Sequence, residues 1–201
     1  MFFYINAPIL VKAVWFIITY IFSKRLGKGI FFPYFCKAKP TKKRMKFTLL
    51  VVGRTVEKHY ITAIDDYVAR TKHFISFDME VIPELKNTKS LSAEQQKEKE
   101  GELILKALQP GDVVVLLDEH GKEFRSIEFA DWVERKMHTV NKRLVFIIGG
   151  PYGFAPKIYE VSQEKISLSK MTFSHQMIRL IFVEQLYRAM TILNNNPYHH
   201  E

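Results

Sequence analysis

Three stretches of this sequence hold residues whose types and spacing could do chemistry. The first is the run FIIGGPYGF at 146–154, in which Gly149, Gly150 and Gly153 follow an apolar stretch. Glycine has no side chain, so the backbone can bend sharply or approach another group closely. The spacing matches neither the Rossmann pattern G-x-G-x-x-G nor the P-loop pattern. A plain strand-to-helix turn and a loop lying against a ligand explain this run equally well.

The second stretch is LSKMTFSHQMIR at 168–179, which leads into a long apolar segment. Ser169 and Thr172 offer hydroxyl groups that can bond to nearby backbone, and Ser174 is placed to cap a helix. Capping alone would explain these residues. However, this loop and the glycine run leave their strands in the same sense. If the strands are neighbours in a parallel sheet, the two loops and the end of VVLLD (114–118) could enclose a small ligand.

The third stretch is NPYHHE, which closes the chain. Tyr198 and His199 follow Arg179 and Arg188 of the preceding apolar segment, so an aromatic ring could stack on a base while a guanidinium grips phosphate. A polar terminus is also commonly frayed. The acidic run EQQKEKEGE (94–102) is interpreted as a solvated helix face, and His120 as a surface residue.

The composition limits the classes of protein that fit. The chain has 201 residues, one cysteine and a net charge of +9, so it suits one globular domain without an internal disulfide. Residues 1–44 hold nine of the 30 Lys and Arg residues and no Asp or Glu, which leaves 21 basic and 21 acidic residues from Met45 onward. Bulk charge therefore gives no evidence that this body binds nucleic acid, and no Cys/His cluster has zinc spacing.

Residues 1–44 differ from the rest of the chain. The apolar stretch at 7–22 contains only Lys12 as a charged residue and is shorter than the roughly 20 residues that a comfortable membrane span needs. A marginal membrane anchor stays possible. We favour another interpretation, in which 1–44 is an N-terminal extension from a mis-assigned start or a non-conserved appendage. The domain is then expected at 45–201.

From Met45 the pattern alternates between strands and helices. Buried strands are predicted at 46–53, 112–118 and 143–150, an alternating strand at 76–85 and a short strand at 165–171, with a turn over EHGK at 119–122. Helices are predicted at 57–74, 92–108, 127–138, 157–163 and 175–193, with Ser92 and Ser126 as caps. This spacing indicates an α/β protein with a mainly parallel sheet between helices.

Taken together, these residues resemble a known family. MKFTLLVVGR, QKEKEGELIL, VVLLDEHGK, FIIGGPYGF, ISLSKMTFSHQMIRLIFVEQLYRA and NPYHHE occur in the order and spacing of the ribosomal RNA large subunit methyltransferase H family. Its members are SPOUT-superfamily enzymes that methylate N3 of a pseudouridine in 23S ribosomal RNA. The resemblance covers 45–201. His200 departs from it, because Arg or Lys is expected there.

The resemblance implies a fold and a cofactor that the spacing alone does not give. SPOUT proteins tie the C-terminal part of the sheet into a trefoil knot, whose loops hold S-adenosylmethionine. The positions that correspond to the cofactor site are Leu117, Gly149, Gly150, Leu168, Ser169, Lys170, Met171, Thr172 and Phe173.

The resemblance also implies a homodimeric, cytoplasmic enzyme that acts on 23S ribosomal RNA in the large subunit or the assembled ribosome. His199 is expected to act on the N3 proton, with Tyr198 stacking on the base and Arg179 and Arg188 meeting negative charge. The C-terminal segment NPYHHE (196–201), called the tail below, would contact the cofactor pocket of the other subunit. No metal and no membrane partner are expected for 45–201. The alternatives are a SPOUT methyltransferase that acts on transfer RNA and a non-catalytic ribosome-binding protein.

Overall fold

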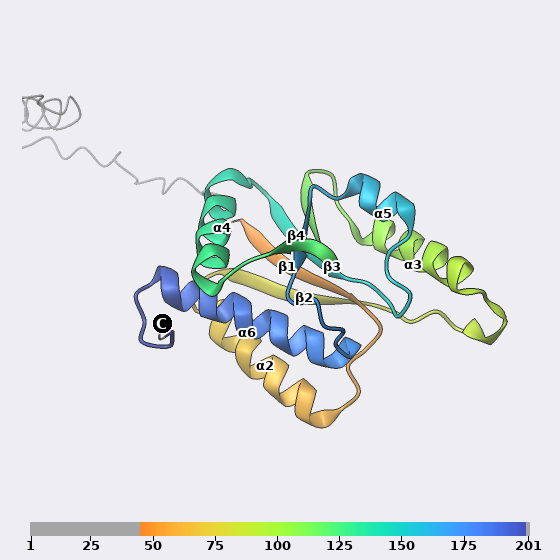
Figure 1. The fold of residues 1–201 in the computed structure, drawn as a ribbon, viewed down its shortest axis with the longest axis horizontal. Coiled ribbons are helices and arrows are strands. Elements are labelled where there is room, and N and C mark those ends of the chain that lie inside the picture. The colour runs from red at the N-terminus through yellow and green to blue at the C-terminus, as the bar shows by residue number, and fades with distance from the viewer. Residues whose placement is uncertain (1–44, 200–201) are drawn as a thin grey trace, which may run out of the picture. The chain divides into compact units, whose positions relative to one another are not determined.

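A computed structural model describes residues 45–199, and the interpretation of 1–44 falls outside these residues. The described chain forms one five-stranded sheet in the order β2-β1-β4-β3-β5, with every pair of neighbours parallel. Figure 1 shows the sheet between two layers of helices. The predicted α/β architecture with a parallel sheet is therefore confirmed.

The strands and helices alternate along the chain as the sequence predicts. In chain order they are β1 (Lys46–Val52), α2 (Lys58–Lys72), β2 (Ser76–Ile82), the 3₁₀ turn η1 (Thr88–Ser90), α3 (Ala93–Ala107), β3 (Asp112–Glu123), α4 (Ser126–Thr139), β4 (Arg143–Ile148), α5 (Pro156–Val161), β5 (Glu164–Ser167) and α6 (His175–Leu193).

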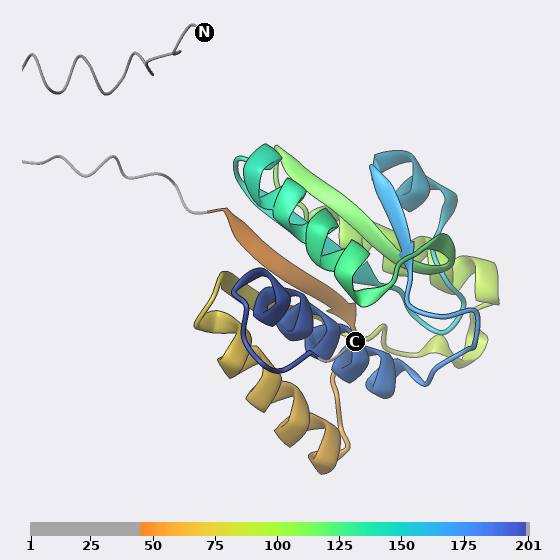
Figure 2. The ribbon, with the colours of Figure 1, turned by 60° about the vertical axis from the view of Figure 1, so that its left-hand side comes forward.

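The two faces of the sheet are covered by different helices. Helices α2, α4 and α6 pack on one face, where the tilted rings of Phe146 and Phe182 lie 4.7 Å apart between their centres. Helices α3 and α5 pack on the other face, around Ile104 and Ile158. Figure 2 shows this division from a second side. Burial on both faces explains the continuous apolar runs at 49–52 in β1, 113–117 in β3 and 144–148 in β4.

The largest departure from the predicted elements is in β3. A turn was predicted at EHGK, but the strand continues to Glu123 with an irregularity between Leu117 and Lys122. The reason lies at Gly121, where an added Cβ atom would approach the backbone of Ile166 to about 2.5 Å. The glycine therefore lets β5 lie close to β3, and the prediction of a turn there was wrong.

Several boundaries also differ. Strand β5 ends at Ser167 and β4 at Ile148, so both predicted strands were too long at their carboxyl ends. Arg125, not Ser126, is the N-cap residue of α4, and the Glu128 side chain accepts from its backbone N–H at 2.9 Å. The Ser92 capping box with Gln95 is confirmed. None of the helices in residues 45–199 combines the length and the apolar character that a bilayer crossing requires.

Candidate functional site

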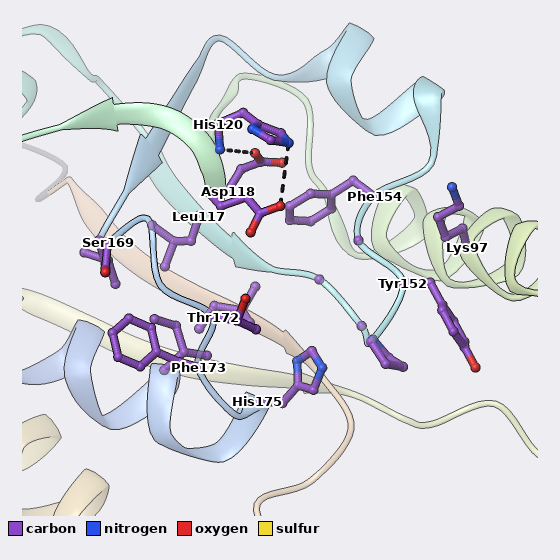
Figure 3. A pocket seen from close by; sticks show the side chains of 18 of the residues that line it. Lys97, Leu117, Asp118, His120, Tyr152, Phe154, Ser169, Thr172, Phe173 and His175 are labelled. Atoms are coloured by element: carbon purple, nitrogen blue, oxygen red, sulfur yellow. Dashed lines mark hydrogen bonds and ion pairs between the residues drawn. The ribbon is translucent and has the colours of Figure 1, made fainter.

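A cavity of about 770 Å³ opens at the carboxyl edge of the sheet. Strand β3 lies between β4 and β5, and residues 117–120 of β3 converge there with the loops that follow β4 and β5. Residues of α3, α5 and the first turn of α6 complete the wall (Figure 3). The predicted meeting of the two loops and the end of VVLLD is confirmed, although β4 and β5 flank β3 instead of pairing with each other.

Most of the residues predicted to hold a cofactor line this cavity. They are Leu117, Gly149, Gly150, Leu168, Ser169, Met171, Thr172 and Phe173. Lys170 does not line it, because its side chain is 83% exposed and forms a 3.7 Å ion pair with Glu123. Apolar side chains and exposed backbone therefore form much of the wall, with few charged groups.

The glycine run turns sharply at the mouth of the cavity. Gly153 has φ +79°, a left-handed conformation that favours glycine, and its N–H donates to the Gly150 carbonyl at 3.1 Å. An added Cβ atom at Gly149 would lie 3.1 Å from the ring of Phe154, and one at Gly150 would press on the carboxyl group of Glu100. Packing beneath the loop thus requires small residues at 149 and 150, independently of any ligand.

Asp118, in the middle of β3, links this strand to α5 across one side of the cavity. Its Oδ2 accepts from the Tyr159 hydroxyl at 2.6 Å, and its Oδ1 accepts from the His120 backbone N–H at 2.8 Å. Burial, and then the hydrogen bond to Asp118, raise the pKa of Tyr159 well above its ordinary value. Tyr159 therefore stays protonated and keeps donating to Asp118 over the physiological range.

The loop between β5 and α6 is held by its own hydroxyl groups. Ser169 Oγ accepts from the Met171 backbone N–H at 2.9 Å, and Ser167 Oγ donates to the Ser169 carbonyl at 3.0 Å. Ser174 accepts from the N–H of Met177 and caps α6, as predicted. These contacts fix the backbone and leave Met171 75% exposed.

Two basic residues follow at the first turns of α6. His175 lies at the rim of the cavity, where desolvation and then the charge of Arg179 lower the pKa of its imidazole. Arg179 is only 3% exposed and donates to the Val52 carbonyl at 2.7 Å and to Thr55 Oγ1 at 3.0 Å. Its observed contacts join α6 to the end of β1, and its predicted contact with phosphate stays a prediction.

The remaining predicted catalytic residues lie at the opposite end of α6. The Tyr198 hydroxyl donates to Glu184 Oε1 at 3.1 Å and lies 3.1 Å from the Tyr67 hydroxyl. Arg188 also donates to Glu184, at 2.5 Å, and its guanidinium lies 4.8 Å from the centre of the Tyr198 ring. His199 follows, half-buried. Within one chain, the structure therefore does not bring Tyr198, His199 or Arg188 to the cavity.

Sequence reasoning missed several residues of the cavity wall. Tyr159 was not singled out, Asp118 entered only as the last residue of VVLLD, His120 was assigned to the surface, and His175 was predicted only as the first residue of a helix. His120 is largely exposed, with 78% of its side chain accessible, yet it borders the cavity. The one usable signal was position, because Asp118 ends VVLLD and His175 lies within LSKMTFSHQMIR, two of the segments that were predicted to form the site.

The burial of Glu100 corrects the prediction that residues 94–102 form a solvated helix face. The run EQQKEKEGE was interpreted as a solvated helix face, but Glu100 is 4% exposed and Gly101 is buried with it. They face α5 and the glycine loop, because the apolar side of α3 that packs on the sheet includes this turn. Within residues 45–199, no group of three His, Cys, Asp or Glu side chains is placed to hold a metal ion.

Comparison with known proteins gives matches over the same part of the chain. A family model described as "Predicted SPOUT methyltransferase" matches residues 45–199. Ribosomal RNA large subunit methyltransferase H of Phocaeicola vulgatus is 92% identical over 157 residues, which cover 78% of this chain and all of that protein. The protein of the same name from Bacteroides thetaiotaomicron is 83% identical with the same coverage. A solved structure of a probable methyltransferase from Bordetella pertussis Tohama I is 12% identical, with a TM-score of 0.42, over 73% of this chain and 94% of that one.

Proposed function

Because this chain belongs to the SPOUT methyltransferase family, we propose that it transfers a methyl group from S-adenosylmethionine to N3 of a pseudouridine in 23S ribosomal RNA. The supporting observation is the cavity, whose walls are the segments that carry the family's motifs. The proposed substrate is taken from the names of the relatives and from the resemblance of the chain, from Met45 onward, to the ribosomal RNA large subunit methyltransferase H family. The proposed setting is the cytoplasm, with the large ribosomal subunit or the assembled ribosome as the partner.

The residues of the cavity fit the cofactor. A volume of about 770 Å³ lies within the range of small-molecule sites, and the mixture of apolar wall and exposed loop backbone suits an adenosine group. Leu117, the glycine loop at 149–150 and the segment at 168–173 would hold it, with Lys170 contributing backbone rather than side chain. When bound, the cofactor supplies a methyl group on a sulfonium, an already activated carbon.

The protein must then orient the base and accept a proton. N3 of pseudouridine carries a weakly acidic N–H, so a positioned acceptor accelerates its reaction. We assign this role to His199, and we assign Tyr198 to stacking on the base. Arg188 is placed beside Tyr198 to meet phosphate or developing negative charge. Arg179 can contribute positive charge from the first turns of α6 while it keeps its hydrogen bonds to Val52 and Thr55.

These roles require a second chain. Helix α6 has 19 residues and is therefore about 28 Å long, with the cavity at its first turn and the tail beyond its last. A tail that acts on a base beside the cofactor must come from elsewhere, so we propose a homodimer in which each tail completes the partner's pocket. The proposal includes the trefoil knot that the resemblance implies.

The direct test is mass spectrometry of RNA from cells with and without this gene. We expect one N3-methylated pseudouridine to disappear from 23S ribosomal RNA and to return when the full chain is supplied again. The His199→Ala chain, expressed to the same level, should not restore it. Loss of a methyl mark from transfer RNA instead would favour the first alternative. Intact methylation in both RNAs, together with no affinity of the protein for S-adenosylmethionine, would favour a non-catalytic ribosome-binding protein.

A further inference from the structure

A buried carboxyl group lies directly behind the glycine loop. Glu100 projects from α3 and is 4% exposed, and its Oε1 accepts from the Gln96 side-chain amide at 2.8 Å. Its Oε2 has no hydrogen-bond partner among residues 45–199. A buried carboxylate with an unpaired oxygen is unfavourable, so its presence needs a physical reason.

The position of this carboxyl group relates it to the cofactor cavity. Gly150 lines the cofactor cavity and also a second, smaller cavity of about 340 Å³, which Glu100 lines as well. An added Cβ atom at Gly150 would lie 2.8 Å from Glu100 Cδ. The bare backbone of Gly150 is thus the wall between the Glu100 carboxyl group and the space assigned to the cofactor.

The surrounding charges leave Glu100 without a cation of its own. On α3, Lys97 pairs with Glu94 at 2.9 Å, and on α5 Lys157 pairs with Glu98 at 2.7 Å. Glu84, which follows β2, and Arg54, which follows β1, line the second cavity, as do His175 and Arg179 of α6. Arg179 makes its hydrogen bonds to Val52 and Thr55, and within 45–199 none of these cations forms an ion pair with Glu100.

We propose that Glu100 is a specificity-determining residue, whose buried charge makes the pocket prefer the cationic S-adenosylmethionine to the neutral product S-adenosylhomocysteine. The inference rests on the proposed function. Methyl transfer removes the positive charge from sulfur, while the amino, carboxyl and adenosine groups are common to both molecules. A carboxylate screened by little water therefore discriminates between them by charge, which favours release of the product and binding of a new cofactor.

Protonation gives this proposal a signature that packing alone would not give. Burial, with a smaller contribution from Glu84, raises the pKa of Glu100 above its ordinary value, against the hydrogen bond from Gln96. A cation bound across Gly150 stabilises the ionised form and lowers that pKa again. Binding of S-adenosylmethionine should then release a proton from Glu100, and its affinity should rise with pH. Binding of S-adenosylhomocysteine should not depend on this group.

Isothermal titration calorimetry of the full chain with each of the two molecules tests the proposal. In Glu100→Gln, which keeps the shape of the side chain, we expect the affinity for S-adenosylmethionine to fall about tenfold, as a poorly screened charge pair predicts. The affinity for S-adenosylhomocysteine should change less than about twofold. The matched control is Glu98→Gln on the same helix, whose carboxyl group is 48% exposed and pairs with Lys157. It should alter neither affinity.

If Glu100→Gln lowers the affinities for S-adenosylmethionine and S-adenosylhomocysteine equally, the proposal is overturned and Glu100 is a packing residue. If that variant does not fold, titration of the wild type in buffers of different ionisation enthalpy decides instead. Proton release on binding S-adenosylmethionine must exceed that on binding S-adenosylhomocysteine, and equal release would contradict the proposal. In a folded Glu100→Gln chain, any release that persists belongs to other groups, with His175 the first of them. Wild-type protein that binds neither molecule would refute the proposed function itself, a different outcome from equal weakening.

Discussion

The two ends of α6 differ in what they contact: the first turn borders an open cavity, and the last turns hold the C-terminal tail. At its first turns, the helix borders a cavity whose wall is largely backbone and apolar side chains, and the polar groups there mainly hold loops in place. At its last turns, Tyr198 folds back on the helix and its hydroxyl bonds to Glu184 beside Arg188. One end keeps space open, and the other fixes a tail in a defined position. The comparison teaches that neither end is a complete site for methyl transfer.

The strongest test of this comparison mixes two inactive chains. Gly150→Val should disrupt the pocket, because its side chain would clash with Glu100 behind the loop and displace the glycine backbone that lines the cavity, and His199→Ala removes the proposed proton acceptor. Each variant alone should lose most methyl transfer, by about 100-fold or more. A mixture should recover about a quarter of wild-type activity, because about half the dimers are mixed and each of these has one intact site.

Two controls make the mixing experiment decisive. Native mass spectrometry of differently tagged chains must show that subunits exchange, and His199→Ala must bind S-adenosylmethionine as the wild type does. If subunits exchange and activity does not return, pocket and tail belong to the same chain. Full activity of His199→Ala alone would remove this residue from the mechanism.

The second test compares the arginines at the two ends. Arg179 is 3% exposed and donates to the Val52 carbonyl, whereas the side chain of Arg188 is 25% exposed. Arg179→Met leaves that carbonyl without its partner, so we expect the free energy of unfolding to fall by about 3 kcal/mol. Arg188→Met should lower it by about 1 kcal/mol or less. Urea unfolding of both variants measures the difference, and equal losses would contradict the distinction between the two ends.

The layered fold could be predicted from the sequence, because its signals are local. The stretches at 49–52 and 144–148 are apolar throughout, which is expected where both faces of a strand are covered. The glycine at 121 misled the prediction, since the same residue serves a turn or a close approach of strands. Only the pairing of β3 with β5 distinguishes the two.

The site could be predicted only in part, because its geometry depends on sheet order. The loops at 149–154 and 168–173 were expected to meet, and in the structure both line the cavity together with residues 117–120 of β3. The bond from Tyr159 to Asp118 joins residues 41 positions apart, and the burial of Glu100 follows from packing against the glycine loop. Neither has a signature in the local pattern, and for Glu100 the surrounding charged residues indicated the opposite.

A smaller effect is expected within the glycine loop itself. A methyl group at Gly150 would press on the buried Glu100 carboxyl, whereas one at Gly149 would meet the Phe154 ring at 3.1 Å. We expect Gly150→Ala to lower the free energy of unfolding by about 2 kcal/mol and to weaken binding of S-adenosylmethionine. Gly149→Ala should cost about 1 kcal/mol or less, since a slight ring shift relieves it. Thermal unfolding and calorimetry measure both, and the reverse order would show that the carboxyl moves more easily than the ring.

The smallest effect, and the finest test of the tail, is expected for Tyr198→Phe. The substitution removes the hydroxyl that contacts Glu184 and Tyr67 but keeps the ring, which packs edge-on against Tyr187 at 4.9 Å. Loss of these hydrogen bonds should lower the free energy of unfolding by about 1 kcal/mol. If the ring acts by stacking on a base, methyl transfer should stay within about threefold of wild type, whereas Tyr198→Ala should lose far more. Steady-state kinetics with 23S ribosomal RNA in ribosomes separates the two variants. A Phe variant as inactive as the Ala variant would show that the tail works through its hydroxyl, and that Glu184 holds Tyr198 for chemistry and not merely for position.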